Sequence, residues 1–276
     1  MTVKGLAGSS CRQIFKQIKT LLSSAVFLIL SLAAGSATTD TVKIAVGEWP
    51  PYFSENAEGY GTYAQVVTRA FELEGVTVEY GFFPWRRALL QTQSGLWHAS
   101  AGWGKTRDRE PFFHFCDAVL VEREHFFYAT DRPVEAQSLQ DLSGLSLGVI
   151  DGAALGEELK ELVSSGQITV FHQSTLEDLF KMLDVGRIDV VMGNEKVAAD
   201  ALASAFVDQE TKRFKALENV TVLWDYRVIV SKKIENGEDL CARFNRGLRK
   251  LHDTGEYDRL LWPDTKEDGQ SHASPS

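Results

Sequence analysis

The sequence predicts an α/β fold with largely parallel strands, because short apolar runs alternate with helical patterns along most of the chain. Two segments, residues 89–103 (LLQTQSGLWHASAGW) and 181–195 (KMLDVGRIDVVMGNE), also repeat one order of helix, glycine, strand, glycine and loop. Parallel strands bind ligands beyond their carboxyl ends, so two such ends facing each other would form a cleft between two lobes. Similar segments also recur within one continuous sheet, and the repeat alone leaves both arrangements open.

The first series of elements precedes residue 105. Apolar runs predict strands and 3.6-residue spacing predicts helices, with prolines and glycines at the boundaries. We expect strands at residues 42–47, 76–83 and 97–102, and helices at residues 62–74 and 84–95. The last of these strands delivers a loop, AGWGKTRDRE (residues 101–110).

The second series begins near residue 138 and has the same alternation. We expect strands at residues 145–152, 168–171 and 187–193, and helices at residues 153–166, 174–186 and 194–206. Ser174 is the expected N-cap of the second of these helices. Extended chain follows at residues 220–232, and then two helices within residues 237–264 that are separated at Gly255.

The first 37 residues have the layout of a secretory signal peptide. Four basic residues precede an uncharged apolar run of about 15 residues, and small residues lead to an expected cleavage after Ala37. An uncleaved membrane anchor is the alternative, but the run is shorter than the roughly 20 residues that span a bilayer. We therefore expect export, to the periplasm if the source is Gram-negative.

Charge and composition limit the possible partners of the mature chain. Without residues 1–37 it has 25 basic and 38 acidic residues, a net charge of −13, which is unfavourable for nucleic acid binding. We expect no cofactor and no metal, because two remaining cysteines and scattered histidines form no metal-binding pattern. The polar residues 263–276 are expected to be a disordered tail.

Cys116 and Cys241 are the two cysteines of the mature chain. An exported protein can join such a pair in a disulfide. Sequence alone supplies no geometry for that bond, so two buried free thiols are the favoured interpretation.

Seven short segments, in this order and spacing, resemble the periplasmic solute-binding proteins of the polar amino acid uptake type, known as family 3. They are WPPYF (49–53), PWRRAL (84–89), AGWGKTRDRE (101–110), FHFCD (113–117), LQDLSGLSLGVIDG (139–152), VGRIDVVMGNE (185–195) and TGEYDRLLW (254–262). The resemblance covers about residues 41–262. It implies two α/β lobes joined by two hinge strands, near residues 119–123 and 223–227, with a ligand cleft between the lobes. Lobe 1 would comprise residues 40–120 plus 227–262, and lobe 2 residues 121–226.

The resemblance also implies an anion-binding loop. Arg109 stands where the family has the arginine that binds a ligand carboxylate, and a guanidinium offers two parallel donors to such a group. Gly102 and Gly104 would let the backbone approach the ligand. Thr106 is expected either to cap a helix that begins after it or to donate its hydroxyl to the ligand.

Aromatic side chains are expected to form the walls of the cleft. Trp49 and Trp85 match positions where the family often places rings around the ligand, and Trp103 lies within the anion-binding loop. Tyr52 and Phe53 are weaker candidates. Core packing is the alternative for each of these rings.

Three positions depart from the pattern of amino acid binders. Asn194 stands where the family usually has an aspartate for the ligand's α-ammonium group, and Gly104 and Ala154 stand where hydroxyl residues are frequent. At Ala154, the N-terminus of the following helix could still offer backbone N–H groups to an anion. We therefore expect a ligand with a carboxylate and an apolar or aromatic body, without strict need for an α-ammonium, unless a nearby acid compensates. The candidates for that role are Glu48, Asp151 and Glu195.

The sequence thus predicts a monomeric binding protein that captures a small carboxylate-bearing solute, an amino acid or a related organic acid, for ABC-type uptake through a membrane permease complex. A lone sensory module that reports to a receptor is the first alternative. An enzyme that resembles cyclohexadienyl dehydratase on the same scaffold is the second, and it would need a positioned general acid. We expect no enzymatic activity.

Overall fold

A computed structural model describes residues 40–263 of the chain. The expected signal peptide (residues 1–37) and residues 264–276 of the expected disordered tail lie outside the described residues. Over the described range, no helix has both the length and the apolar character needed to cross a membrane.

Strands and helices alternate along both halves of the described chain, which confirms the α/β fold. The first half contains β1 (Asp40–Val46), η1 (Glu58–Tyr60), α2 (Thr62–Glu72), β2 (Val76–Phe82), α3 (Trp85–Gln93), β3 (Ala99–Gly104) and β4 (Phe113–Ala129). The second half contains η2 (Leu139–Leu142), β5 (Ser146–Ile150), α4 (Glu157–Ser164), β6 (Thr169–Gln173), α5 (Leu176–Asp184), β7 (Val190–Asn194), α6 (Glu195–Ala205), α7 (Asp208–Thr211), β8 (Phe214–Ser231), α8 (Gly237–Thr254) and α9 (Glu256–Leu261).

These strands form one sheet in the order β2-β1-β3-β8-β4-β7-β5-β6. Strand β1 pairs in parallel with β2 and β3, and β5 pairs in parallel with β6 and β7. The two parallel groups are joined through the antiparallel pairs of β3 with β8, β8 with β4, and β4 with β7. The sheet therefore contains two parallel halves with a long antiparallel ribbon between them.

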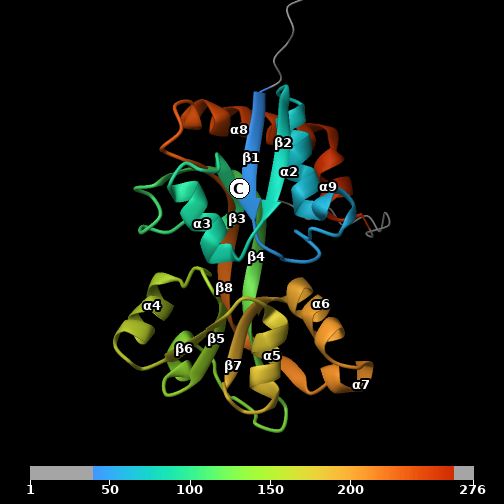
Figure 1. Cartoon of the computed structure of the whole chain (residues 1–276). Helices are drawn as coiled ribbons and strands as arrows, with labels where there is room; N and C mark the ends of the chain where they lie inside the picture. Colours follow the sequence, from blue (N-terminus) through green and yellow to red (C-terminus); the bar gives the residue numbers. More distant parts are fainter. Residues whose placement is uncertain (1–39, 264–276) are drawn as a thin grey trace, which may run out of the picture. The chain divides into compact units, whose positions relative to one another are not determined.

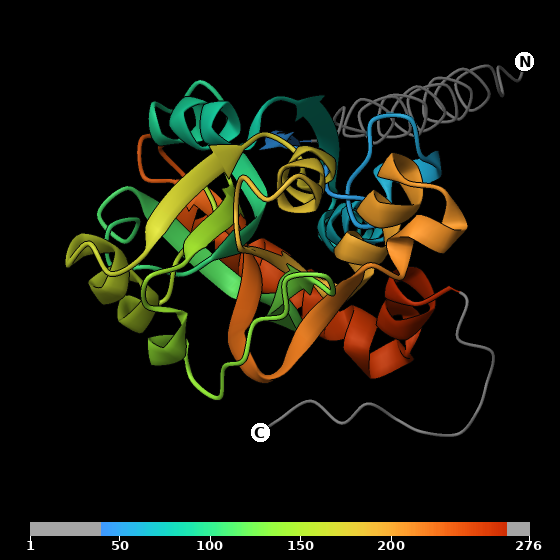
Figure 2. The same cartoon turned by 90° about the horizontal axis from the view of Figure 1, so that it is seen from below.

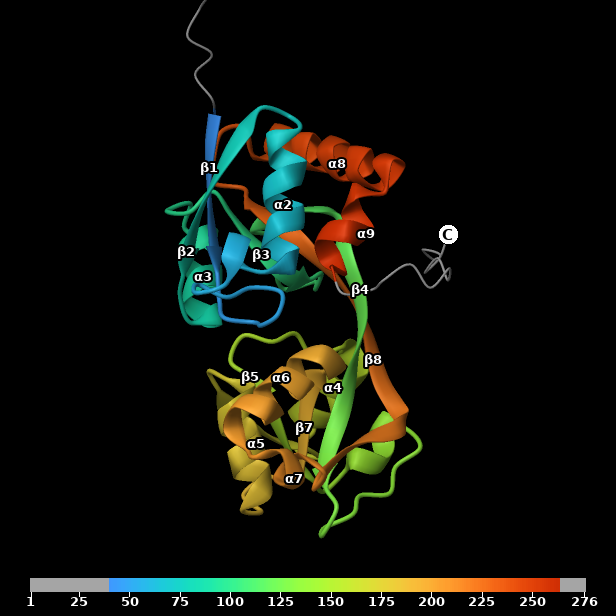
Figure 3. The same ribbon diagram turned by 90° about the vertical axis from the view of Figure 1, so that its right-hand side faces the viewer.

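The ribbon consists of β4 and β8, which have 17 and 18 residues. Figure 1 shows β1–β3 with α2, α3, α8 and α9 around one end of this ribbon, and β5–β7 with α4–α7 around the other. The same division is visible from the side in Figure 3. Both segments predicted as crossovers, residues 119–123 and 223–227, lie within the ribbon.

Helices cover both faces of the strands β5–β7, with α4 on one side and α5 and α6 on the other (Figure 2). Leu159 of α4 packs in one apolar cluster with Leu147 of β5, whereas Leu179 of α5 and Ala198 of α6 belong to another. Burial on both faces explains why β5 and β7 are nearly continuous apolar runs in the sequence, whereas β6, at the edge of the sheet, is largely exposed.

Three expectations about helix starts are wrong. The helix expected from residue 153 begins at Glu157, because the chain first turns after β5, where Gly152 has a φ of +90°. The N-cap of α5 is Thr175 rather than Ser174, since the Thr175 hydroxyl accepts a hydrogen bond from the Asp178 N–H at 3.2 Å. After Thr106 the chain forms turns instead of a helix.

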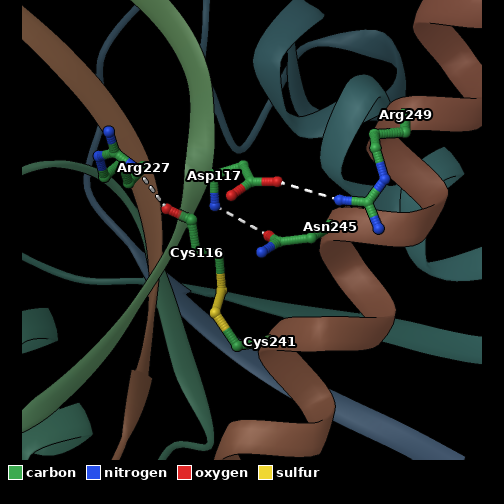
Figure 4. The surroundings of a disulfide bond; sticks show 6 residues. All are labelled: Cys116, Asp117, Arg227, Cys241, Asn245 and Arg249. Atoms are coloured by element: carbon green, nitrogen blue, oxygen red, sulfur yellow. Dashed lines mark hydrogen bonds and ion pairs between the residues drawn. A yellow bond between two sulfur atoms is a disulfide. The ribbon is translucent and has the colours of Figure 1, made fainter.

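The expectation of two free thiols is also wrong, because Cys116 and Cys241 form a disulfide (Figure 4). Strand β4 and helix α8 bring the two Cα atoms to 5.3 Å across 125 residues of sequence. Asn245 of α8 accepts a hydrogen bond from the Asp117 N–H at 2.8 Å, and Arg249 lies 3.4 Å from the Asp117 carboxylate. The pairing is set by this packing, which no local sequence pattern encodes.

Candidate functional site

A cavity of about 510 Å³ lies where the carboxyl ends of both parallel groups converge. Trp49 follows β1, Gly104 ends β3, Gly152 follows β5 and Asn194 ends β7, and all four line the cavity. This is the position at which parallel α/β sheets bind ligands, because loops and free backbone groups gather there. Of the nine expected site residues, only Thr106 does not line the cavity; the others are Trp49, Trp85, Gly102, Trp103, Gly104, Arg109, Ala154 and Asn194.

Arg109 places a positive charge in this cavity. Its Nη1 donates a hydrogen bond to the Gly104 carbonyl at 2.9 Å, and its Nη2 donates to the Gly152 carbonyl at 2.7 Å. The guanidinium carbon lies 4.8 Å from the centre of the Trp103 ring. Burial lowers the pKa of Arg109 to about 10. Within residues 40–263 this guanidinium forms no ion pair with a carboxylate, so its charge is available to an anionic ligand.

The conformation of the loop that carries Arg109 depends on Gly102 and on backbone turns. Gly102 has a φ of +84°, at a break in the β3–β8 register, and this conformation disfavours any residue with a Cβ. The carbonyl of Thr106 accepts hydrogen bonds from the N–H groups of Arg109 and Glu110. Thr106 is buried, does not line the cavity and shapes the turn through its backbone, and no helix begins after it for its side chain to cap.

Aromatic rings form a continuous wall of the cavity. Trp49 and Trp85 meet edge to face at 6.3 Å, and Trp85 meets Trp103 in the same way at 5.2 Å. The Trp85 indole N–H is fixed by the Glu48 carbonyl at 3.0 Å. Tyr226 of β8 packs against Trp49 at 4.8 Å. The wall offers a large apolar surface to a ligand body.

Trp224 of β8 is a wall residue that the sequence analysis missed. A Cβ at Gly104 would lie 2.6 Å from its Cε3 atom, so the ring occupies the space that a side chain at position 104 would need. This contact explains why a hydroxyl residue is absent there. The only sequence signal was the position of Trp224 within the predicted crossover.

The side chain of Asn194 forms its hydrogen bonds within the protein itself. It is the N-cap of α6, where its Oδ1 accepts hydrogen bonds from the N–H groups of Lys196 at 3.0 Å and Val197 at 3.3 Å. Its Nδ2 donates to Oε2 of Glu122 at 3.1 Å. The amide oxygen that could have accepted a bond from a ligand ammonium is therefore already used twice.

The three acids expected to supply the negative charge that Asn194 lacks lie in different places. Glu48 lines the cavity with an exposed side chain, and it accepts a hydrogen bond from the Glu55 N–H at 2.9 Å. Asp151 and Glu195 do not line the cavity, and Asp151 instead lies 3.9 Å from Arg86. Ala154 lines the cavity from the loop before α4, but that helix begins three residues later than Ala154, so the expected helix N-terminus is not beside it.

Glu124 of β4 is the acid that the sequence analysis missed. Its side chain lines the cavity and is only 8% exposed. It accepts a hydrogen bond from the hydroxyl of Tyr226. Burial raises the pKa of Glu124 to about 7, and the nearby Glu122 adds to the rise, whereas the Tyr226 hydrogen bond opposes it. The signal was the pair of acids Glu122 and Glu124, two residues apart and so on the same face of a predicted extended segment, where a buried charge needs a reason.

The described part of the chain contains no group of three or more His, Cys, Asp or Glu side chains that could hold a metal ion. Among the groups that line the cavity, the less exposed ones are the Arg109 guanidinium, the buried carboxyl group of Glu124 and the aromatic wall.

A family model of the bacterial extracellular solute-binding proteins, family 3, matches residues 42–262. The chain therefore belongs to this family. None of the curated proteins compared with the chain matches it.

Solved structures share the fold at low sequence identity. An ancestral arginine-binding protein bound to arginine has a TM-score of 0.69 and 20% identity, over 82% of this chain and 98% of that one. A histidine kinase sensor domain with similarity to periplasmic binding proteins has a TM-score of 0.68 and 20% identity, over 80% of this chain and 95% of the other. An ancestral amino acid-binding protein, a precursor of cyclohexadienyl dehydratase, has a TM-score of 0.63 and 18% identity, over 82% and 95% of the two chains.

Proposed function

We propose that this protein captures a small carboxylate-bearing solute, an amino acid or a related organic acid, and delivers it to an ABC-type permease. The observation that carries the proposal is the Arg109 guanidinium in the cavity. Its two hydrogen bonds to the carbonyls of Gly104 and Gly152 orient the group but leave its charge unpaired. A ligand carboxylate would supply both the missing charge and further hydrogen-bond acceptors.

The rest of the cavity suits this class of solute. The aromatic wall of Trp49, Trp85 and Trp103 would cover the ligand body. The cavity volume of about 510 Å³ lies within the range of small-molecule sites. A structural neighbour was solved with arginine bound, which supports an amino acid or a relative of one as the solute.

We propose that capture takes place outside the cytoplasm, in keeping with the extracellular family. Residues 1–37 would act as the signal peptide and, in a Gram-negative source, the mature protein would be a periplasmic monomer. Closure of two lobes about the β4–β8 ribbon would enclose the solute, because both parallel groups contribute to the cavity and, within residues 40–263, the two long strands β4 and β8 continue between them.

A sensory role is the second candidate, and the similarity to a histidine kinase sensor domain favours it. Transport and sensing need the same cavity. Adjacent genes for a permease and an ATPase would support uptake, and an adjacent receptor gene would support sensing.

An enzyme on this scaffold is the third candidate, and the buried carboxyl group of Glu124 is the observation in its favour. We propose binding without turnover. Incubation of the purified protein with prephenate tests this, and release of a dehydrated, decarboxylated product would establish the enzyme instead.

A thermal-shift screen of the mature protein against amino acids, amines, dicarboxylates and aromatic acids tests the leading proposal, because a ligand of the folded state raises its melting temperature. We expect hits only among compounds with a carboxylate. Hits confined to amines without a carboxylate would overturn the proposal.

A further inference from the structure

We infer that Glu124 is the specificity-determining hydrogen-bond acceptor of the cavity, so that the preferred solute carries a cationic nitrogen in addition to its carboxylate. The inference rests on the proposed function, since it names the substrate class of that same site. It differs from the expectation based on Asn194, because a different residue, on the β4–β8 ribbon, supplies the negative charge.

The two acids of β4 have different partners. Glu122 accepts hydrogen bonds from the Tyr52 hydroxyl at 3.3 Å and from Nδ2 of Asn194 at 3.1 Å, so both of its oxygens are used. Glu124 accepts one bond, from Tyr226, on Oε1. Its Oε2 accepts no hydrogen bond from residues 40–263, although the side chain is more than nine-tenths buried and lines the cavity. A buried carboxylate that is left half satisfied carries a cost which a donor on the solute would remove.

The charges around the cavity favour a solute with a positive group. Five carboxylates line it against the two cations Arg109 and Lys181. The carboxylates are those of Glu48, Glu124, Glu177, Asp178 and Asp200. Glu124 alone among these five is buried, so its charge is the least screened by water. A cationic nitrogen would therefore gain the most electrostatic stabilisation at Glu124.

The neighbours of Glu124 also suit a cation. Its partner Tyr226 packs on Trp49 at 4.8 Å, so the Glu124 carboxylate lies beside a ring that packs against the aromatic wall. Ring faces attract cations, and a carboxylate beside them adds direction through a charge-assisted hydrogen bond. In a solute with one carboxylate and one cationic nitrogen, the carboxylate would pair with Arg109 and the nitrogen with Glu124. Neither protein charge would then be left unpaired.

Calorimetry with matched pairs of carboxylates tests the inference. Each pair differs by one amino group: L-phenylalanine and hydrocinnamate, L-leucine and isocaproate, 6-aminohexanoate and hexanoate, δ-aminovalerate and valerate. We expect the mature wild-type protein to bind the amine-bearing member of at least one pair about tenfold or more tighter than its partner.

Glu124→Gln keeps the size and removes the charge, and it should reduce that preference to less than about threefold while the carboxylate still binds. Glu195→Gln, an exposed acid outside the cavity, is the matched control and should leave both affinities unchanged.

Two results would overturn the inference and leave the proposed function standing. One is equal wild-type affinity for the two members of every pair that binds. The other is a preference for the amine-bearing member that survives Glu124→Gln. If that preference disappears in Glu48→Gln instead, the acceptor is Glu48 and not Glu124. If no carboxylate of any pair binds to the wild type, the proposed function fails, and this inference fails with it.

Discussion

Nη2 of Arg109 donates a hydrogen bond of 2.7 Å to the backbone oxygen of Gly152, 43 residues further along the chain. Arg109 follows β3, which belongs to one parallel group of strands, and Gly152 follows β5 of the other group. One side chain therefore joins the two halves of the sheet across the cavity. This contact places the group proposed to bind the ligand carboxylate between the two parts of the sheet that would separate if the cavity opened.

The first prediction concerns this motion. If the two halves of the sheet move as rigid bodies about the β4–β8 ribbon, a saturating ligand should reduce the radius of gyration measured by small-angle X-ray scattering. Arg109→Ala with the same ligand is the control, and it should show no reduction. An unchanged radius for the ligand-bound wild type would contradict hinge closure.

Arg109→Ala should largely abolish binding of a confirmed carboxylate ligand while the protein still folds. Loss of a buried, charge-assisted pair costs about 2–5 kcal/mol, or roughly 30-fold to several thousand-fold in affinity. Calorimetry measures the affinity, and circular dichroism checks the fold. Arg107→Ala, an exposed arginine of the same turn, should bind like the wild type. An affinity within threefold of the wild type for Arg109→Ala would place the anion site elsewhere.

Asn194→Asp should destabilise the protein by about 1–3 kcal/mol at neutral pH. The substitution keeps the N-cap acceptor but puts a carboxylate oxygen where Nδ2 now donates to Glu122 at 3.1 Å. Chemical denaturation measures the loss. Adding Glu122→Gln should restore most of the stability, because the new amide can donate to the new carboxylate. If the single variant is as stable as the wild type, the Asn194–Glu122 bond has no structural role.

The stability of the folded protein should fall as the pH rises from about 4.5 to about 7. Burial raises the pKa of Glu124 to about 7, so the folded state keeps a proton that the unfolded state has already lost in this range. The contribution is up to about 3 kcal/mol, present at low pH and lost at neutral pH. Groups that act on Glu124 are Tyr226 from β8 and Glu122 from its own strand.

Denaturation curves at several pH values, with Glu124→Gln beside the wild type, measure this contribution. The variant stays neutral, so its advantage over the wild type should grow between pH 4.5 and 7. Glu195→Gln serves as the exposed control and should follow the wild type. A constant difference between Glu124→Gln and the wild type would contradict the predicted ionisation.

Reduction of the Cys116–Cys241 disulfide should lower the free energy of unfolding of the mature protein by about 2–4 kcal/mol. The bond links β4 to α8 and closes a long loop, which restricts the unfolded chain. Denaturation with and without reductant measures the change. The double variant Cys116→Ser/Cys241→Ser should be insensitive to reductant, and an insensitive wild type would contradict a stabilising bond.

Much of the fold follows from local patterns in the sequence. The spacing of Val66, Val67, Ala70 and Phe71 defines the buried face of α2, and Gly95 and Gly255 lie where helices end. Such signals are short-range, because helix and strand periodicities involve residues within a few positions of each other. The repeated strand-and-glycine segments also indicated the cavity, since the carboxyl ends of parallel strands share one edge.

The sequence by itself thus determined the α/β alternation, the strand ends that border the cavity and, through resemblance to a family, Arg109 as a cation that lines it. Only the tertiary structure decided the partners of these groups. It joined Cys116 to Cys241, paired Nδ2 of Asn194 with Glu122, and placed Glu124 in the cavity beside Tyr226. These outcomes depend on contacts between residues about 70 to 125 positions apart, whose distances are fixed by the packing of the whole sheet. A periodicity of two or of 3.6 residues carries no information about such distances.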